Sequence, residues 1–178
     1  MKRRFNKRGQ VWVETVLYTL IAFALMGLVL GFAKPKIQQL QDKTIIEQSI
    51  SMMESIDLAI TEVIQGGSGN KRLIEVAIRK GMLNVDGSLN KLEYSLEGSY
   101  IYSEPGEEIQ EGNLIISSEV RGKISTVKVG RDYSNYNLTY QNLDELKIIT
   151  KAATPYQIVI SNKGKDSSDK TIINFELN

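Results

Sequence analysis

The sequence predicts an α+β protein in which a long N-terminal helix precedes an antiparallel β domain. Two observations support this fold class. The nineteen residues from Thr15 to Ala33 carry no formal charge, and as a helix they would rise about 28 Å, close to the hydrocarbon thickness of a bilayer. Beyond Asp86-Gly87, apolar and polar residues alternate as they do in half-buried strands.

A second, amphipathic half is expected to continue the same helix after Lys34-Pro35-Lys36, where the proline predicts a kink or local loosening. Apolar residues recur there with the helical period, and they are Ile45, Ile46, Ile50, Met53, Ile56, Ala59, Ile60, Val63 and Ile64. Glu47, Glu54 and Glu62 fall on the opposite side. The apolar face is therefore predicted to pack against the domain that follows.

The β domain is predicted to contain about seven short strands. The clearest alternation lies at 92–97, 156–161 and 173–177, and further strands are expected at 113–120, 123–130, 136–140 and 145–151. Such a set suggests a sandwich, or a curled sheet wrapped on the outer half of the helix. Residues 71–80 fit either a short helix or a strand.

These patterns divide the chain into four parts. Residues 1–9 form a basic leader, and 10–65 form the long helix, with an apolar half at 10–34 and an amphipathic half at 36–65. Residues 66–91 connect the helix to a β domain at 92–178. Glycines at 66–70 end the helix.

The start of the chain differs from an ordinary secretory signal. Five basic residues precede the apolar run, which places the N-terminus in the cytoplasm and the rest outside. The small residue, Gly9, stands before the apolar run, whereas a secretory cleavage site follows it. Glu14 places a carboxylate at the mouth of the apolar helix, where acids usually have a partner. The simpler alternative is an interfacial acid on a plain anchor helix.

Together, Lys7-Arg8-Gly9, the spacing from Gln10 to Glu14 and the apolar run resemble the class III signal peptide of archaeal type IV pilins. This resemblance implies that a prepilin peptidase cuts the Gly9–Gln10 bond, so that Glu14 becomes the fifth residue of the mature chain. It also implies a homopolymer built through the apolar helix. The further partners that it implies are an assembly ATPase and its membrane platform.

Two features of the apolar helix would assist such assembly. Cleavage frees an α-amine that is mostly protonated near neutral pH, and Glu14 of a neighbouring helix would neutralise it in a low-dielectric filament core. Gly27 and Gly31 form a GxxxG motif, which lets helices approach closely. Glycine is also common in membrane helices, so both interpretations of the motif stay open.

Composition excludes several functions. Removing residues 1–9 takes away five of the 22 basic residues and no acid, which leaves a net charge of −4 and argues against binding nucleic acid. The chain has no cysteine and no histidine, which excludes disulfides, thiol chemistry and Ser-His catalysis. We therefore expect a non-enzyme with no cofactor and no metal site.

Three surface features have competing interpretations. The acidic turns at 104–111 and 166–169 are read as solvated loops in preference to weak calcium sites. Asn137 begins a glycosylation sequon and is predicted to face outward from its strand. The tyrosines near turns either form an adhesive surface or pack at sheet edges, and they are Tyr100, Tyr102, Tyr133, Tyr136 and Tyr140.

The sequence thus predicts a filament subunit that begins as a precursor in the cytoplasmic membrane and ends in an extracellular filament on the cell surface, where it serves adhesion. A minor subunit or an archaellum-like component is a variant of this hypothesis. The alternative is a signal-anchored extracytoplasmic binding domain that never polymerises.

Overall fold

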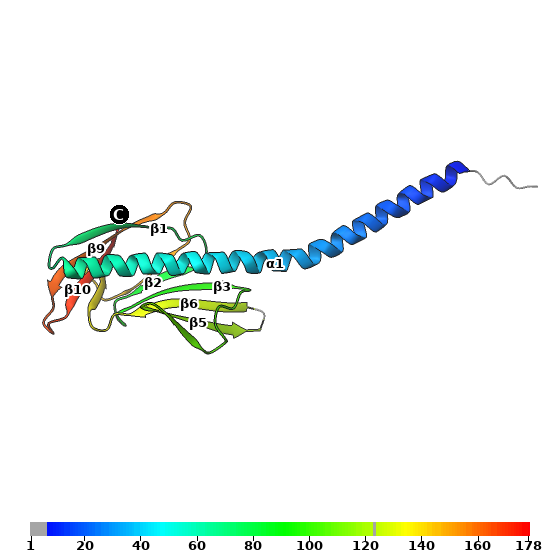
Figure 1. Ribbon diagram of the computed structural model, residues 1–178. Helices are drawn as coiled ribbons and strands as arrows, with labels where there is room; N and C mark the ends of the chain where they lie inside the picture. The colour runs from blue at the N-terminus through cyan, green and yellow to red at the C-terminus, as the bar shows by residue number, and fades with distance from the viewer. Residues whose placement is uncertain (1–6, 123) are drawn as a thin grey trace, which may run out of the picture. The chain divides into compact units, whose positions relative to one another are not determined.

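The protein is a long helix followed by two β sheets, which confirms the predicted α+β class (Figure 1). The computed structural model describes residues 7–122 and 124–178, with side chains from residue 11 onward. The chain divides into two compact units, Met1–Leu40 and Gln41–Asn178. Residues 1–6 of the predicted leader lie outside the described part.

Helix α1 extends over Lys7–Gln65 and therefore begins a little before the predicted start at Gln10. Its helical backbone includes Pro35. At its end the amide of Gly66 donates to the carbonyl of Glu62 at 2.9 Å, and Gly67 adopts a φ of 78°. A left-handed glycine just past the last turn satisfies the final carbonyls, so the helix ends where the glycine cluster predicts.

Ten strands follow the helix within the described residues. Their bounds are β1 Lys71–Val76, β2 Met82–Asp86, β3 Lys91–Gly98, β4 Glu108–Glu111, β5 Leu114–Arg121, β6 Ile124–Asp132, β7 Asn137–Tyr140, β8 Leu146–Thr150, β9 Tyr156–Lys165 and β10 Thr171–Leu177. A four-stranded sheet has the order β1-β9-β10-β7, and a six-stranded sheet has the order β4-β5-β6-β3-β2-β8. Neighbours are antiparallel except for β7 and β10, which are parallel.

Each of the seven predicted strand ranges contains a strand, and the open choice at 71–80 is resolved as strand β1. Strand β2 lies inside the segment predicted to be a connection, so the β region begins at Lys71 and not at residue 92. Strand β4 reads Glu-Ile-Gln-Glu and is exposed throughout. Because it has no buried face, it carries no alternation for a sequence pattern to detect.

The core of the second unit forms around the later half of α1, which Figure 1 shows lying along the sheets. The predicted apolar face is confirmed, since Met53 and Val63 are fully buried and Ile46, Ile56 and Ile60 are 1% exposed. Residues from both sheets join them in one cluster, including Val76, Ile160 and Phe175 from the smaller sheet and Leu92, Leu96 and Val129 from the larger. Burial on this scale is the main stabilising contribution to the unit.

We predict that Met53→Ala lowers the free energy of unfolding by about 2–5 kcal/mol, because the truncation leaves a cavity in this core. Leu58 is the matched control on the same helix, since its side chain is 61% exposed. Leu58→Ala should change stability by less than about 0.5 kcal/mol. Denaturant unfolding of the full chain in detergent would measure both variants, and equal losses would contradict the assigned core.

Candidate functional site

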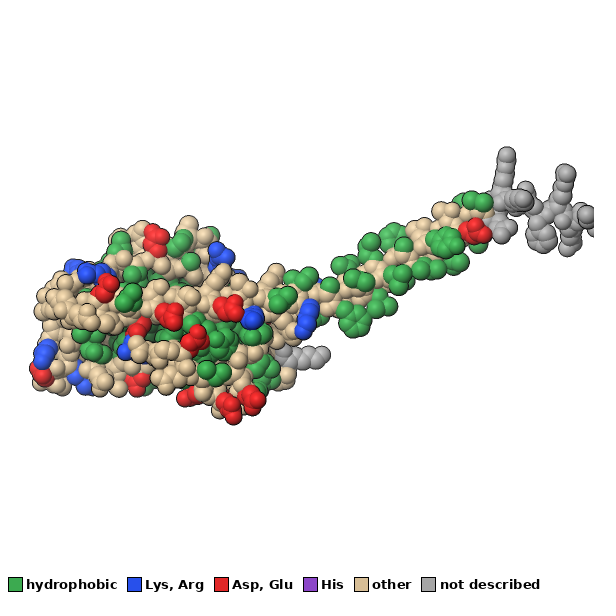
Figure 2. Space-filling model, in the orientation of Figure 1, with side chains coloured by type: hydrophobic (Ala, Val, Ile, Leu, Met, Phe, Trp, Pro, Cys, Tyr) green, Lys and Arg blue, Asp and Glu red, His purple; other side chains and the backbone are tan. Residues whose placement is uncertain are grey.

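The first candidate site is the apolar surface of α1 in the first unit. Every side chain from residue 11 to 32 is exposed, and Figure 2 shows hydrophobic side chains along this part of the helix. The large ones are Val11, Trp12, Val13, Val16, Leu17, Tyr18, Leu20, Ile21, Phe23, Leu25, Met26, Leu28, Val29, Leu30 and Phe32. The segment is long and apolar enough to cross a membrane, so it is compatible with membrane anchoring.

Polar groups within this segment are held by the helix itself. The hydroxyl of Thr15 donates to the carbonyl of Val11 at 2.9 Å, and that of Thr19 donates to the carbonyl of Thr15 at 2.7 Å. Such bonds to the preceding turn satisfy a hydroxyl where no water is available. Glu14 lies on the same helix with an exposed side chain, so a formal charge stands within the apolar surface.

Gly27 and Gly31 lie one turn apart on this helix, as the GxxxG spacing requires. A side chain added at either position would meet nothing within 4 Å. Both glycines thus form an open, flat strip on an otherwise bulky surface, which is the geometry that permits close helix approach.

The predicted cleavage site falls at the margin of the described residues. Gly9 and Gln10 belong to the helical backbone of α1, while their side chains lie outside the described part. Cleavage between them stays a prediction.

A buried carboxylate, Asp42, ties the start of the second unit together. It is 2% exposed, and its Oδ1 lies 2.5 Å from Lys80 Nζ. The amide and hydroxyl of Ser99 donate to its Oδ2 at 2.8 and 3.1 Å. Burial alone would raise the pKa of Asp42, but Lys80 and the Ser99 donors outweigh it and hold the pKa below its usual value.

Gly98 makes room for this arrangement. A Cβ at that position would lie 2.5 Å from Asp42 Oδ2. Any larger residue would therefore push the carboxylate away from the Ser99 donors.

A second buried carboxylate, Asp57, ties the middle of α1 to the larger sheet. Tyr133 donates to Asp57 Oδ1 at 2.7 Å, and Asn113 Nδ2 donates to Oδ2 at 3.1 Å. Arg131 forms an ion pair with Asp57, and its guanidinium carbon lies 4.9 Å from the centre of the Tyr133 ring. Burial raises the pKa of Tyr133, so its hydroxyl stays a donor at neutral pH.

Sequence reasoning missed both carboxylates, although the helical period contained a signal. Asp42 and Asp57 fall in phase with the buried face, whereas Glu47 and Glu54 fall on the exposed side. An acid in phase with a buried apolar face indicates a partner elsewhere in the chain, because an unpaired buried charge is costly.

The acidic turns use their carboxylates locally. Asp166 Oδ1 accepts the amides of Ser168 and Lys170 at 2.8 and 2.9 Å, and Glu111 accepts the hydroxyl of Tyr102 at 2.9 Å. Among the described residues, no group of three acidic side chains is placed to hold a metal ion.

The sequon on β7 lies in a more covered position than predicted. Leu138 is fully buried, as its inward orientation required, but Thr139 is also only 5% exposed and donates to Asn174 Oδ1 at 2.9 Å. Asn137 is half-buried, with its amide 3.5 Å from Asp166 Oδ2. The strand is covered on both faces, so glycosylation at Asn137, which stays a prediction, would need this strand to be released.

The turn tyrosines belong to the core and its margin. Tyr133 is 2% exposed, and Tyr100, Tyr102, Tyr136 and Tyr140 are partly buried against the core cluster. Of the two interpretations that the sequence left open, packing is therefore the one that the structure favours.

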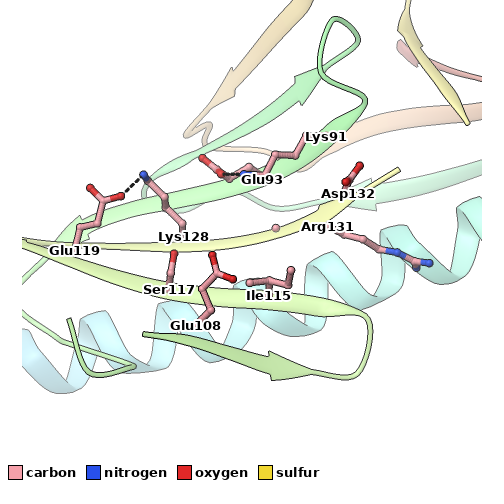
Figure 3. Close-up of a pocket in the computed structure, with 10 residues that line it drawn as sticks. Lys91, Glu93, Glu108, Ile115, Ser117, Glu119, Lys128, Arg131 and Asp132 are labelled. Carbon is pink, nitrogen blue, oxygen red and sulfur yellow. Dashed lines mark hydrogen bonds and ion pairs between the residues drawn. The ribbon is translucent and has the colours of Figure 1, made fainter. Parts of the chain in front are cut away.

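A groove of about 240 Å³ lies on the outer face of the larger sheet (Figure 3). It is hollow above Gly130, which has no side chain. Lys91 lies 2.6 Å from Glu93, and Lys128 lies 2.5 Å from Glu119. Each lysine is thus paired with a neighbouring carboxylate, as expected for a solvated, charge-balanced sheet face.

No protein-family model, curated protein or solved structure matches this chain in the three comparisons. The argument about function therefore depends on the residues and their geometry.

We predict that Asp42→Asn destabilises the second unit by about 1–3 kcal/mol at neutral pH, because a buried charge-assisted network is lost. The folded pKa of Asp42 is lowered, so the unfolded state binds more protons as the pH falls below about 4. The stabilisation is present above that value and is lost as pH falls through the folded pKa. Unfolding curves at pH 7 and pH 3 should converge for wild type and variant, and a constant difference would contradict this assignment.

Proposed function

We propose that this chain is a structural subunit of a type IV pilus-like surface filament, cleaved after Gly9 and polymerised through its apolar N-terminal helix. The observation that carries the proposal is the exposed apolar surface of α1 directly behind a basic-glycine motif. A plain anchor explains the apolar surface. The glycine before it and Glu14 five residues later need the further explanation that pilin-type processing supplies.

The proposed assembly exchanges one apolar environment for another. Before assembly the surface at residues 11–32 is surrounded by lipid, and in the filament it is surrounded by the same surface of other copies. Because lipid tails are as apolar as leucine, the exchange changes the hydrophobic free energy little, and packing decides the outcome. The open strip at Gly27 and Gly31 favours such packing.

Glu14 has a specific role in this proposal. Cleavage would leave the α-amine of Gln10 four residues before the Glu14 carboxylate. In a core of low dielectric constant an unpaired charge costs several kcal/mol, whereas opposite charges on adjacent helices offset this cost. The pair would therefore fix the axial register between neighbours.

The second unit would form the outer part of the filament. Its core contains the later half of α1, so the same helix carries both the polymerising surface and the folded β region. The basic residues before the apolar run support a cytoplasmic N-terminus in the precursor. The proposed partners are a prepilin peptidase, a pilus assembly ATPase with its membrane platform, and other copies of this chain, and the proposed role is adhesion.

Cleavage is tested by co-expressing the chain with a prepilin peptidase and determining the N-terminus of the product. We expect a mature chain that begins at Gln10. Gly9→Asp should block cleavage while leaving membrane insertion unchanged. A product that still begins at Met1 would contradict the proposal and would favour an anchored domain that does not polymerise.

The role of Glu14 is tested separately by Glu14→Ala in cells that assemble the filament. We expect normal cleavage but a filament yield reduced at least tenfold, corresponding to about 1.4 kcal/mol or more per contact. Glu54→Ala is the matched control, because Glu54 is an exposed acid on the same helix in the second unit. Equal filament yields from the two variants would exclude Glu14 from assembly.

A further inference from the structure

The two sheets have four edge strands in the described structure, and two of these edges are protected. The edge of β7 is covered because the Leu138 amide donates to Asn90 Oδ1 at 2.7 Å. Strand β4 is four residues long and begins and ends with glutamate. Short or charged edges resist pairing with another chain. The edges of β1 and β8 remain as the candidates for a contact.

Both remaining edges carry exposed apolar side chains next to their unpaired backbone. Leu73 on β1 is 57% exposed, and Leu146 and Ile148 on β8 are 51% and 48% exposed. Strand β1 also borders a groove of about 290 Å³ that separates it from the Ser51 and Ser55 side of α1. The backbone edge of β1 is therefore accessible along its length.

These two strands run in the same direction. Strand β1 runs back along α1, because Arg72 near its start pairs with Glu62 at 2.9 Å while Arg79 beyond its end lies beside Ile45. Strand β8 is antiparallel to β2, which leads away from the Asp42 end of the unit. Both β1 and β8 therefore point toward the Asp42 end.

The ends of the two strands also lie level with each other. The amide of Ala152 donates to the carbonyl of Ile78 at 3.1 Å, just beyond the last residues of β8 and β1. In a filament all copies point the same way, so β8 of one copy would meet β1 of a lateral neighbour in parallel orientation with little axial shift.

Charge supports the same orientation. In a parallel register that places Leu73 beside Leu146, Lys71 lies beside Asp144 and Arg72 beside Glu145, and all four charged side chains are exposed. This register differs by one residue from the alignment of Ile78 with Ala152. Antiparallel registers of similar overlap either form no opposite-charge pair or place like charges opposite each other.

The faces of the two sheets match in this register as well. Leu73 and Leu146 are both exposed on outer faces, and Val76 and Ile149 are both buried on inner faces at 1% and 3% exposure. Pairing would therefore continue the smaller sheet of one copy into the larger sheet of the next without reversing either face.

We infer that β8 of one copy adds in parallel to the edge of β1 of a second copy, forming a lateral contact between the outer parts of the filament. The contact uses two different surfaces, so it is head-to-tail and can repeat without closing. The inference rests on the proposed filament function. It adds a defined interface to the helix packing of the core.

The absence of cysteine in the sequence makes a direct test possible. Copies with Leu73→Cys and copies with Leu146→Cys are assembled together, and sheared filaments are oxidised and run on a non-reducing gel. Adjacent parallel strands lie about 4.8 Å apart, within the Cα range that a disulfide bridges. We expect a disulfide-linked dimer in the mixture and none with either variant alone.

The matched control replaces the second partner. Ile115 is 43% exposed on β5, at a distance from β8 within the larger sheet. Filaments mixed from Leu73→Cys and Ile115→Cys copies should give a several-fold lower cross-linked fraction. Filaments that form normally but give no Leu73–Leu146 dimer would overturn the edge pairing and leave the proposed function intact. Failure of the wild-type chain to form filaments would overturn both.

A charge exchange provides a second measurement that needs no new thiol. Arg72→Glu should make filaments dissociate at lower temperature, because it opposes Glu145 in the inferred register. Adding Glu145→Arg should restore the wild-type value. Identical dissociation temperatures for the single and double variants would contradict the register.

Discussion

The structure depends on one constraint, which is that the apolar surface of α1 between residues 11 and 32 must be removed from water. Fully burying one large apolar side chain is favourable by about 1.5–3 kcal/mol, and this surface carries a continuous series of them. Together they exceed the 5–15 kcal/mol that stabilises a typical domain. Lipid and the same helix of other copies both satisfy the constraint, so a single surface suits both a membrane precursor and a filament.

The later half of α1 meets a different constraint, because its apolar face packs against the sheets of its own chain. Asp42 and Asp57 fix that packing at two heights, each through partners distant in sequence. Charged groups in such positions contribute little net stability compared with apolar residues, but they penalise shifted alternatives. We propose that they hold the helix in one axial position against the β region.

Local pattern was sufficient for the elements and insufficient for their connections. The helical period from Ile46 to Val63 and the alternation in seven strands were readable because each is a short-range consequence of burial. Strand β4 lacks such a pattern, and the parallel pairing of β7 with β10 depends on contacts between distant segments. The partners of Asp42 could not be named because Lys80 and Ser99 come together only in the fold. The leader motif was readable, although the part of it before residue 7 lies outside the described structure.

The measurement that tests the account most directly is the N-terminal sequence of this chain recovered from sheared surface filaments. Cells that supply a prepilin peptidase and the pilus assembly machinery would express the full chain, and mass spectrometry would compare the filament and membrane fractions. The account predicts that the filament fraction contains the chain with Gln10 as its first residue. A chain that stays in the membrane fraction and begins at Met1 would contradict it.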